Sequence, residues 1–137
     1  MTENAIATQI VDAAYRIHRE LGPGLLEFVY EIVLAAELKK RGLQVLRQHP
    51  VPTAYEGLQF QIGFRADLVV QDLALVEVKS VEMIAPVHQK QLLTYLKLTD
   101  RKLGLLINFN VNLIKDGVKR VVNGLSDDHA KARSSQS

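Results

Sequence analysis

Apolar residues recur every three or four positions in three segments of the chain. This spacing predicts amphipathic helices at about Glu3 to Glu20, Leu25 to Lys40 and Val87 to Leu98. Gly22-Pro23-Gly24 is expected to end the first helix, and Gly42 the second, because glycine readily takes the backbone conformation that closes a helix.

Shorter runs rich in aliphatic and β-branched residues indicate strands. They cover Gln44 to Val51, Phe64 to Val70, Ala74 to Ser80, Leu103 to Phe109 and Lys119 to Val122. The Pro50-Val51-Pro52 sequence is expected to end the first of these, and Tyr55-Glu56-Gly57 predicts a turn. The resulting order, ααβββαββ, predicts an α/β domain with a mixed central sheet flanked by helices.

The length of 137 residues predicts a single domain, which we place at residues 1–125. Residues 126–137 hold no apolar residue larger than alanine, so we expect a disordered C-terminal tail. No cysteine is present, which excludes disulfides and thiolate zinc sites. The chain lacks a membrane-length apolar run and a signal-peptide pattern, so we expect a soluble, cytoplasmic protein with no membrane partner. A net charge of +2 permits a nucleic-acid partner without requiring one.

Candidate chemistry lies on two adjacent predicted strands, as Asp67 and, after nine residues, Glu77-Val78-Lys79. Side chains alternate along a strand, so Glu77 and Lys79 share one face. A three-residue loop, Gln71 to Leu73, places Asp67 directly opposite Glu77, with Cβ atoms about 4.5 to 5.5 Å apart. Two carboxylates at that separation can share a divalent cation, and an ammonium beside them suits phosphodiester cleavage. A two-residue loop would place Asp67 opposite Val76 and destroy the site.

The alternative for these charges is a cross-strand salt bridge on an exposed hairpin, which contributes only about 0.2 to 1 kcal/mol. Leu75 and Val81 share their face, which indicates a partly covered cleft. Charges are rarely kept in such a place without a ligand or a tight ion pair.

The third predicted helix carries a polar stripe of His88, Gln91 and Tyr95, which we expect to face inward because leucines flank it. Gln91 and Tyr95 could then orient a phosphate, a bound water or Lys79. Alternatively, Tyr95 is a core aromatic with its hydroxyl at the rim, and Gln91 caps a sheet edge. His18, at the edge of the core face of the first helix, is interpreted as a packed or hydrogen-bonded residue and stays outside the catalytic set.

The segment Gly24-Leu25-Leu26-Glu27-Phe28-Val29-Tyr30 resembles the signature of the small proteins named GxxExxY. The segments FRADLVV and LVEVKS and the Gln91-x-x-x-Tyr95 helix follow in the order of that family, so the resemblance extends to about Leu125. The family is assigned to the PD-(D/E)XK nuclease superfamily, and the glutamine-tyrosine element is similar to that of its RecB-like and λ-exonuclease-like branches. Ala66 stands where the superfamily's name has proline, a common replacement.

The resemblance implies a restriction-endonuclease-like core in which Asp67 and Glu77 are metal ligands and Lys79 is the catalytic lysine. It also implies that Glu27, from an N-terminal helix, contributes a further acid to the metal site. The Val78 carbonyl could complete an open Mg²⁺ or Mn²⁺ shell. Glu27 has an alternative role, because a glutamate in the first turn of a helix binds its free N–H groups and favours its dipole.

We therefore expect a Mg²⁺- or Mn²⁺-dependent nuclease that acts on DNA more readily than on RNA, with a role in DNA repair or recombination. The expected catalytic set is Asp67, Glu77, Lys79, Gln91 and Tyr95. The alternative is a non-catalytic module that retains the fold and binds nucleic acid or another protein. A domain this small is expected to depend on a homodimer or a larger protein partner for substrate choice.

Overall fold

The computed structural model describes residues 1–125, and for residues 51–53 and 60–64 it describes the backbone only. The elements in chain order are α1 (Glu3–Leu21), α2 (Glu27–Lys40), β1 (Val45–Tyr55), β2 (Leu58–Val70), β3 (Ala74–Lys79), α3 (Pro86–Thr99), β4 (Leu103–Asn108), the short 3₁₀ helix η1 (Ile114–Asp116) and β5 (Val118–Val122). The predicted order of helices and strands is confirmed. The predicted disordered tail, residues 126–137, lies outside the described residues.

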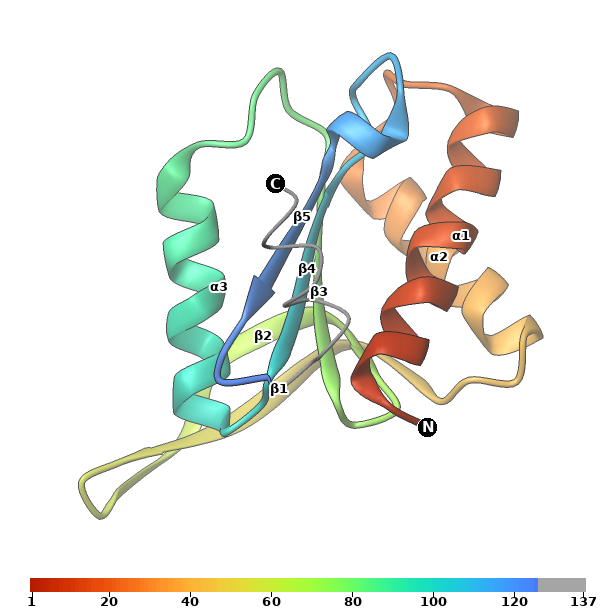
Figure 1. Ribbon diagram of the computed structural model, residues 1–137. Coiled ribbons are helices and arrows are strands. Elements are labelled where there is room, and N and C mark those ends of the chain that lie inside the picture. The colour runs from red at the N-terminus through yellow and green to blue at the C-terminus, as the bar shows by residue number, and fades with distance from the viewer. Residues whose placement is uncertain (126–137) are drawn as a thin grey trace.

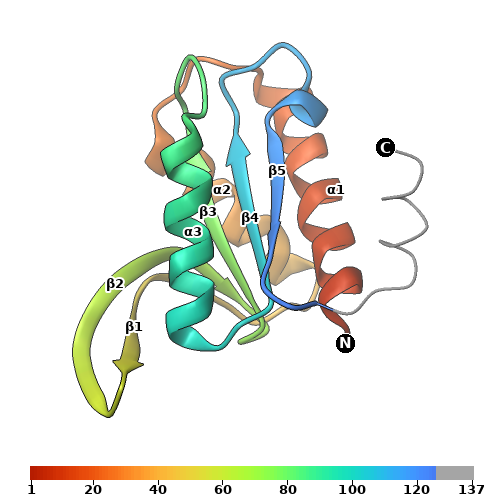
Figure 2. The same ribbon diagram turned by 60° about the vertical axis from the view of Figure 1, so that its left-hand side comes forward.

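The five strands form one mixed sheet in the order β1-β2-β3-β4-β5. Only β3 and β4 run parallel, because α3 connects them across one face, and the other neighbours are antiparallel. Figures 1 and 2 show α1 and α2 on one face of the sheet and α3 on the other. The protein is therefore a three-layered α/β domain with its central strands covered on both sides.

Two hydrophobic cores lie on the two faces of the sheet. Val76 and Val78 of β3 belong to the core beneath α1 and α2, whereas Leu75 belongs to the core beneath α3. All residues of β4 are buried, since both faces of this strand are covered. The double coverage explains why the sequence shows a continuous apolar run there instead of alternation.

Helix α3 packs closely on the sheet at Gly104 of β4. A Cβ atom added at Gly104 would lie 2.9 Å from two side-chain carbons of Leu92, which is fully buried on α3. The missing side chain therefore lets the helix approach β4. This contact fixes the distance between α3 and the neighbouring strand β3, which carries Glu77 and Lys79.

Strand β1 continues four residues beyond the predicted end at Val51, so the prediction that the prolines end it is wrong. The strand lies at the edge of the sheet, where a proline without an N–H group is tolerated. Its pairing with β2 shifts register between Val51 and Thr53, around Pro52. The predicted turn is present, with positive φ at Glu56 and Gly57. The two strands form a long hairpin that projects past the end of α3 (Figures 1 and 2).

The remaining predicted boundaries shift by small amounts, except that β2 begins at Leu58 and not at Phe64. Helix α2 begins at Glu27 because Leu26 has extended backbone angles and acts as its N-cap residue. Within the described residues, no helix combines the length and the apolar character needed to cross a membrane.

Candidate active site

The β2–β3 hairpin has the three-residue loop that the sequence predicts, because Val70 pairs with Ala74. The pairing continues to Leu68 and Val76, one step before Asp67 and Glu77. Beyond that step the Asp67 side chain replaces the backbone ladder, since its Oδ2 accepts a hydrogen bond from the Val78 N–H at 2.8 Å. The register therefore brings Asp67 next to Glu77.

The Glu77 carboxyl lies in an environment that disfavours its charge. Burial, followed by the neighbouring charge of Asp67 and a side-chain contact with that carboxyl, raises the pKa of Glu77 to about 8. The charge of Lys79 and a backbone hydrogen bond from Asp67 act in the opposite direction. Glu77 Oε1 is buried and has no hydrogen-bond partner. Such an orphaned oxygen beside a second carboxyl is complementary to a cation.

Lys79 and Glu77 lie on the face of β3 that also carries Leu75, and Leu75 packs beneath α3. The Lys79 charge lowers the pKa of Glu77, so the ammonium acts on the carboxyl pair. The Lys79 carbonyl accepts the Phe109 N–H at 2.9 Å on the β4 side of the strand. The backbone of Lys79 is thus held against β4.

The carboxyl pair fits a divalent cation with oxygen ligands. Mg²⁺ is commonly held by one or two carboxylates together with water and substrate phosphate. Asp67 and Glu77 could supply the carboxylates. The Val78 N–H points toward β2, and so does its carbonyl, because both groups of one strand residue point to the same neighbour. Residues 1–125 hold no set of three His, Cys, Asp or Glu side chains arranged to bind a metal ion together.

Glu27 lies near the end of β3 but contacts Ser80 there. Its Oε1 accepts the Ser80 N–H at 3.3 Å, while the Ser80 hydroxyl donates to the Leu25 carbonyl at 2.6 Å. These bonds tie the start of α2 to the residue that follows Lys79. Glu27 is therefore at the same end of the hairpin as the carboxyl pair, without forming a three-carboxylate cluster with it.

A second acid of α2, Glu31, connects to the pair through a residue of β1. Glu31 is only 4% exposed and forms an ion pair with Arg47 at 3.0 Å. Its other oxygen accepts a hydrogen bond from Gln48 Nε2 at 2.7 Å, and the same nitrogen donates to Asp67 Oδ1 at 3.1 Å. Sequence reasoning missed both Glu31 and Gln48. The available signal was a carboxylate among the core-facing positions of an apolar helix, three residues before Leu34.

Tyr30 holds the loop that leads into α2. Its ring stacks on Phe109 with centroids 4.4 Å apart. Its hydroxyl donates to the Gly22 carbonyl at 2.6 Å and accepts the Leu25 N–H at 3.1 Å. The tyrosine of the GxxExxY-like segment thus fixes the backbone immediately before Glu27.

Asn108, at the end of β4, holds the loop that follows β3. It is 2% exposed, and its side chain binds both backbone groups of Val81 and the N–H of Asn110. These bonds fix the chain two residues after Lys79. Nothing in the sequence distinguished Asn108, because its partner Val81 is 27 positions away.

The polar stripe predicted on α3 divides into different environments. Tyr95 is half-buried at the α3 core, and burial and the charge of Glu77 raise its pKa. Gln91 is exposed, so the prediction that the whole stripe faces inward is wrong. His88 Nδ1 accepts the Ala85 N–H at 3.2 Å and caps its own helix. Of the three side chains in the stripe, Tyr95 is therefore the one whose pKa responds to the charge of Glu77.

His18 is buried and binds the Val111 carbonyl through Nε2 at 2.7 Å, as expected for a structural histidine. It lies on α1, on the sheet face opposite α3.

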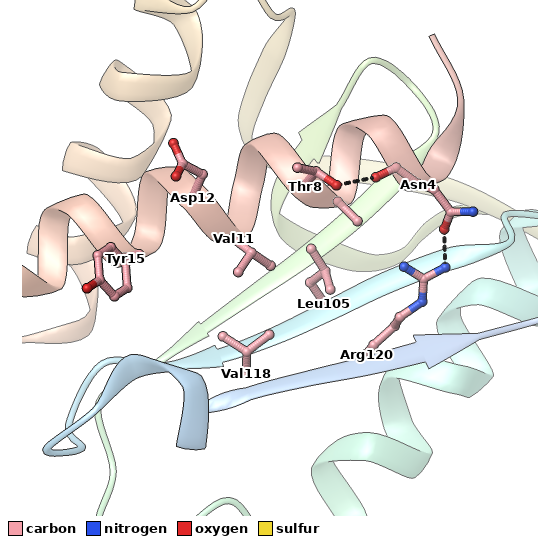
Figure 3. A pocket seen from close by; sticks show the side chains of 9 residues that line it. Asn4, Thr8, Val11, Asp12, Tyr15, Leu105, Val118 and Arg120 are labelled. Atoms are coloured by element: carbon pink, nitrogen blue, oxygen red, sulfur yellow. Dashed lines mark hydrogen bonds between the residues drawn. The ribbon is translucent and has the colours of Figure 1, made fainter. Parts of the chain in front are cut away.

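A hollow of about 560 Å³ on the same face of the sheet runs between α1 and strands β4 and β5 (Figure 3). Its floor is apolar, and Asn4 and Arg120 are hydrogen-bonded at its rim. None of the candidate catalytic residues lines this hollow.

The comparison with protein families identifies the class of protein. Residues 4–121 match the family model of the PD-(D/E)XK nuclease superfamily, which covers the sheet, the three helices and the carboxyl pair. The chain therefore belongs to this superfamily, most of whose members are nucleases that hydrolyse phosphodiester bonds. Searches of curated proteins and of solved structures give no significant match.

Proposed function

We propose that this protein is a nuclease of the GxxExxY group that hydrolyses phosphodiester bonds with Mg²⁺ or Mn²⁺, and that it acts on DNA in preference to RNA. The observation that supports this most directly is the half-buried contact between the Asp67 and Glu77 carboxyls, with Lys79 on the same face of β3 as Glu77. Two acids in contact raise the free energy of the metal-free protein. A site that binds a cation gains from this arrangement, whereas a purely structural one does not.

In the proposed mechanism, Asp67, Glu77 and the Val78 carbonyl hold the cation. The bound cation would neutralise the scissile phosphate and favour attack by water. Lys79 orients the attacking water and stabilises the negative charge that develops on the phosphate oxygens. Tyr95, whose environment includes the Glu77 charge, positions the phosphate or the lysine. Gln91, which is exposed on α3, contacts the substrate backbone.

The superfamily relationship supports a nucleic-acid substrate, and superfamily nucleases generally use Mg²⁺ or Mn²⁺. We infer that the glutamine-tyrosine helix relates the protein to the RecB-like and λ-exonuclease-like branches, and hence to DNA repair or recombination. A homodimer or a partner protein would supply the substrate selection that this small domain lacks.

The test is a cleavage assay with linear duplex, branched and single-stranded DNA and with RNA, in Mg²⁺, Mn²⁺ or EDTA. We expect metal-dependent cleavage that Lys79→Ala reduces at least about 100-fold while DNA binding is retained. Lys102→Ala serves as the matched control, because Lys102 is exposed just before β4, at the end of the sheet opposite the pairing of Lys79 with Asn108. Binding without metal-dependent cleavage in the wild type would instead indicate a non-catalytic module.

A further inference from the structure

Gln48 has an unusual backbone conformation for its place in the fold. Its φ is 48°, in the left-handed region that side-chain-bearing residues rarely adopt. The other described non-glycine residues with positive φ lie in the two hairpin turns or at the end of α3. Gln48 lies inside β1, where the regular pairing of Arg47 with Leu68 and of His49 with Ala66 skips Gln48 and Asp67. Strain of this kind inside a strand often accompanies a functional site.

The conformation places the Gln48 amide between two carboxylates. Its Nε2 donates to Glu31 Oε1 at 2.7 Å and to Asp67 Oδ1 at 3.1 Å, which uses both of its hydrogens. The other Asp67 oxygen accepts the Val78 N–H at 2.8 Å. Two donors on different oxygens fix the plane of the Asp67 carboxylate, while each oxygen retains a lone pair for a cation.

Glu31 anchors this amide from the interior of the protein. The carboxylate is buried on α2 and its second oxygen is held by the Arg47 guanidinium, with Nε at 3.1 Å and Nη2 at 3.0 Å. An ion-paired carboxylate in the core has little freedom to move. The hydrogen-bond chain Arg47–Glu31–Gln48–Asp67 therefore connects a rigid part of α2 to the edge of the carboxyl pair.

We propose that Gln48 is a positioning residue that holds the Asp67 carboxylate in the orientation needed to bind the divalent cation. This inference rests on the proposed nuclease function. Residues that hydrogen-bond metal ligands typically change metal affinity by about 10- to 100-fold when they are replaced. Gln48 has the corresponding geometry and requires a strained backbone to achieve it.

The test measures Mn²⁺ affinity by the electron paramagnetic resonance signal of free and bound Mn²⁺, without substrate, on protein shown to be folded by circular dichroism. Gln48→Gly removes the amide and accommodates the positive φ. We expect it to weaken Mn²⁺ binding about 10- to 100-fold and to change the spectrum of the bound ion. Gln48→Asn also tolerates positive φ, but its shorter side chain does not span both carboxylates, so we expect a similar loss.

Gln71→Gly is the matched control, because it makes the same substitution at a positive φ, in the β2–β3 turn, where the side chain binds the Gln44 N–H and not Asp67. We expect it to bind Mn²⁺ within about threefold of the wild type, as a group that does not touch a metal ligand. Equal affinities in the wild type and both Gln48 variants would overturn the inference and leave the nuclease proposal intact. An equal loss in Gln71→Gly would overturn it as well, since the effect would then come from a general loosening of the hairpin. A wild type that binds no Mn²⁺ would overturn both proposals.

Discussion

The Asp67 carboxylate accepts the Val78 N–H at 2.8 Å, at the point where the β2–β3 backbone pairing ends. This bond keeps the strands together after the ladder stops and leaves the Glu77 carboxyl beside Asp67. The folded protein therefore maintains two acids in contact at a place that is partly shielded from water. Four experiments follow from this arrangement and from the loops that support it.

The stability of the metal-free protein should depend on the ionisation of Glu77. Its pKa is about 8 in the folded protein, against an ordinary value of 4.5. Between these values the folded state binds more protons than the unfolded state, so stability falls as the pH rises. The loss amounts to at most about 4 kcal/mol. Urea unfolding in EDTA between pH 5 and 9 measures it. Glu77→Gln should remove this loss, whereas Glu82→Gln, at an exposed position, should retain it; identical pH profiles for all three proteins would contradict the prediction.

Divalent cations should stabilise the wild type through Asp67. At a free Mn²⁺ concentration 100 times the dissociation constant, binding to the folded state alone adds about 2.7 kcal/mol. Thermal unfolding with and without Mn²⁺ measures the gain as a higher Tm. Asp67→Asn should lose most of it. Asp72→Asn should keep it, because Asp72 lies in the same hairpin, is 82% exposed and pairs with Arg101. A full Mn²⁺ shift in Asp67→Asn would place the cation elsewhere.

Removal of the Tyr30 hydroxyl should loosen the segment before Glu27. Tyr30→Phe keeps the stacking on Phe109 but loses the bonds to the Gly22 carbonyl and the Leu25 N–H. We expect a loss of about 1 to 2 kcal/mol in the free energy of unfolding, since two partly buried backbone groups lose a partner. Hydrogen exchange should show faster exchange at the Leu25 amide, and cleavage should decrease. Tyr15→Phe, on the exposed face of α1, should leave stability, Leu25 exchange and cleavage unchanged. Unchanged Leu25 exchange in Tyr30→Phe would refute the clamping role.

Asn108→Ala should affect the loop behind Lys79. The substitution removes three hydrogen bonds from a buried side chain and leaves the Val81 backbone groups without partners. The expected cost is about 2 to 4 kcal/mol in the free energy of unfolding. Chemical denaturation measures it, and the cleavage rate under conditions where the variant is folded should fall through kcat. Asn112→Ala, at an exposed position, is the control. A stable Asn108→Ala protein with full activity would show that the loop needs no such support.

The sequence predicted the carboxyl hairpin because side-chain alternation and loop length depend only on neighbouring residues in the chain. Alternation places Glu77 and Lys79 on one face, and the loop length sets the register that brings Asp67 alongside. The extent of β1 was missed because proline prevents a strand only where its N–H is needed, and an edge strand does not need it. The exposure of Gln91 was missed because a stripe that includes leucines does not specify how far the helix is rotated against the sheet.

By itself, the sequence determined the order of the elements, the hairpin register and the placement of Asp67, Glu77 and Lys79 on neighbouring strands. Tertiary structure decided which further groups reach them. Glu27 and Glu31 are four residues apart on one face of α2, so periodicity favours neither. The packing of α2 on β1 and β3 directs Glu27 to Ser80 and Glu31 to Gln48, and thus to Asp67. Such contacts join residues distant in sequence, and they depend on where the hydrophobic core holds the helix against the sheet.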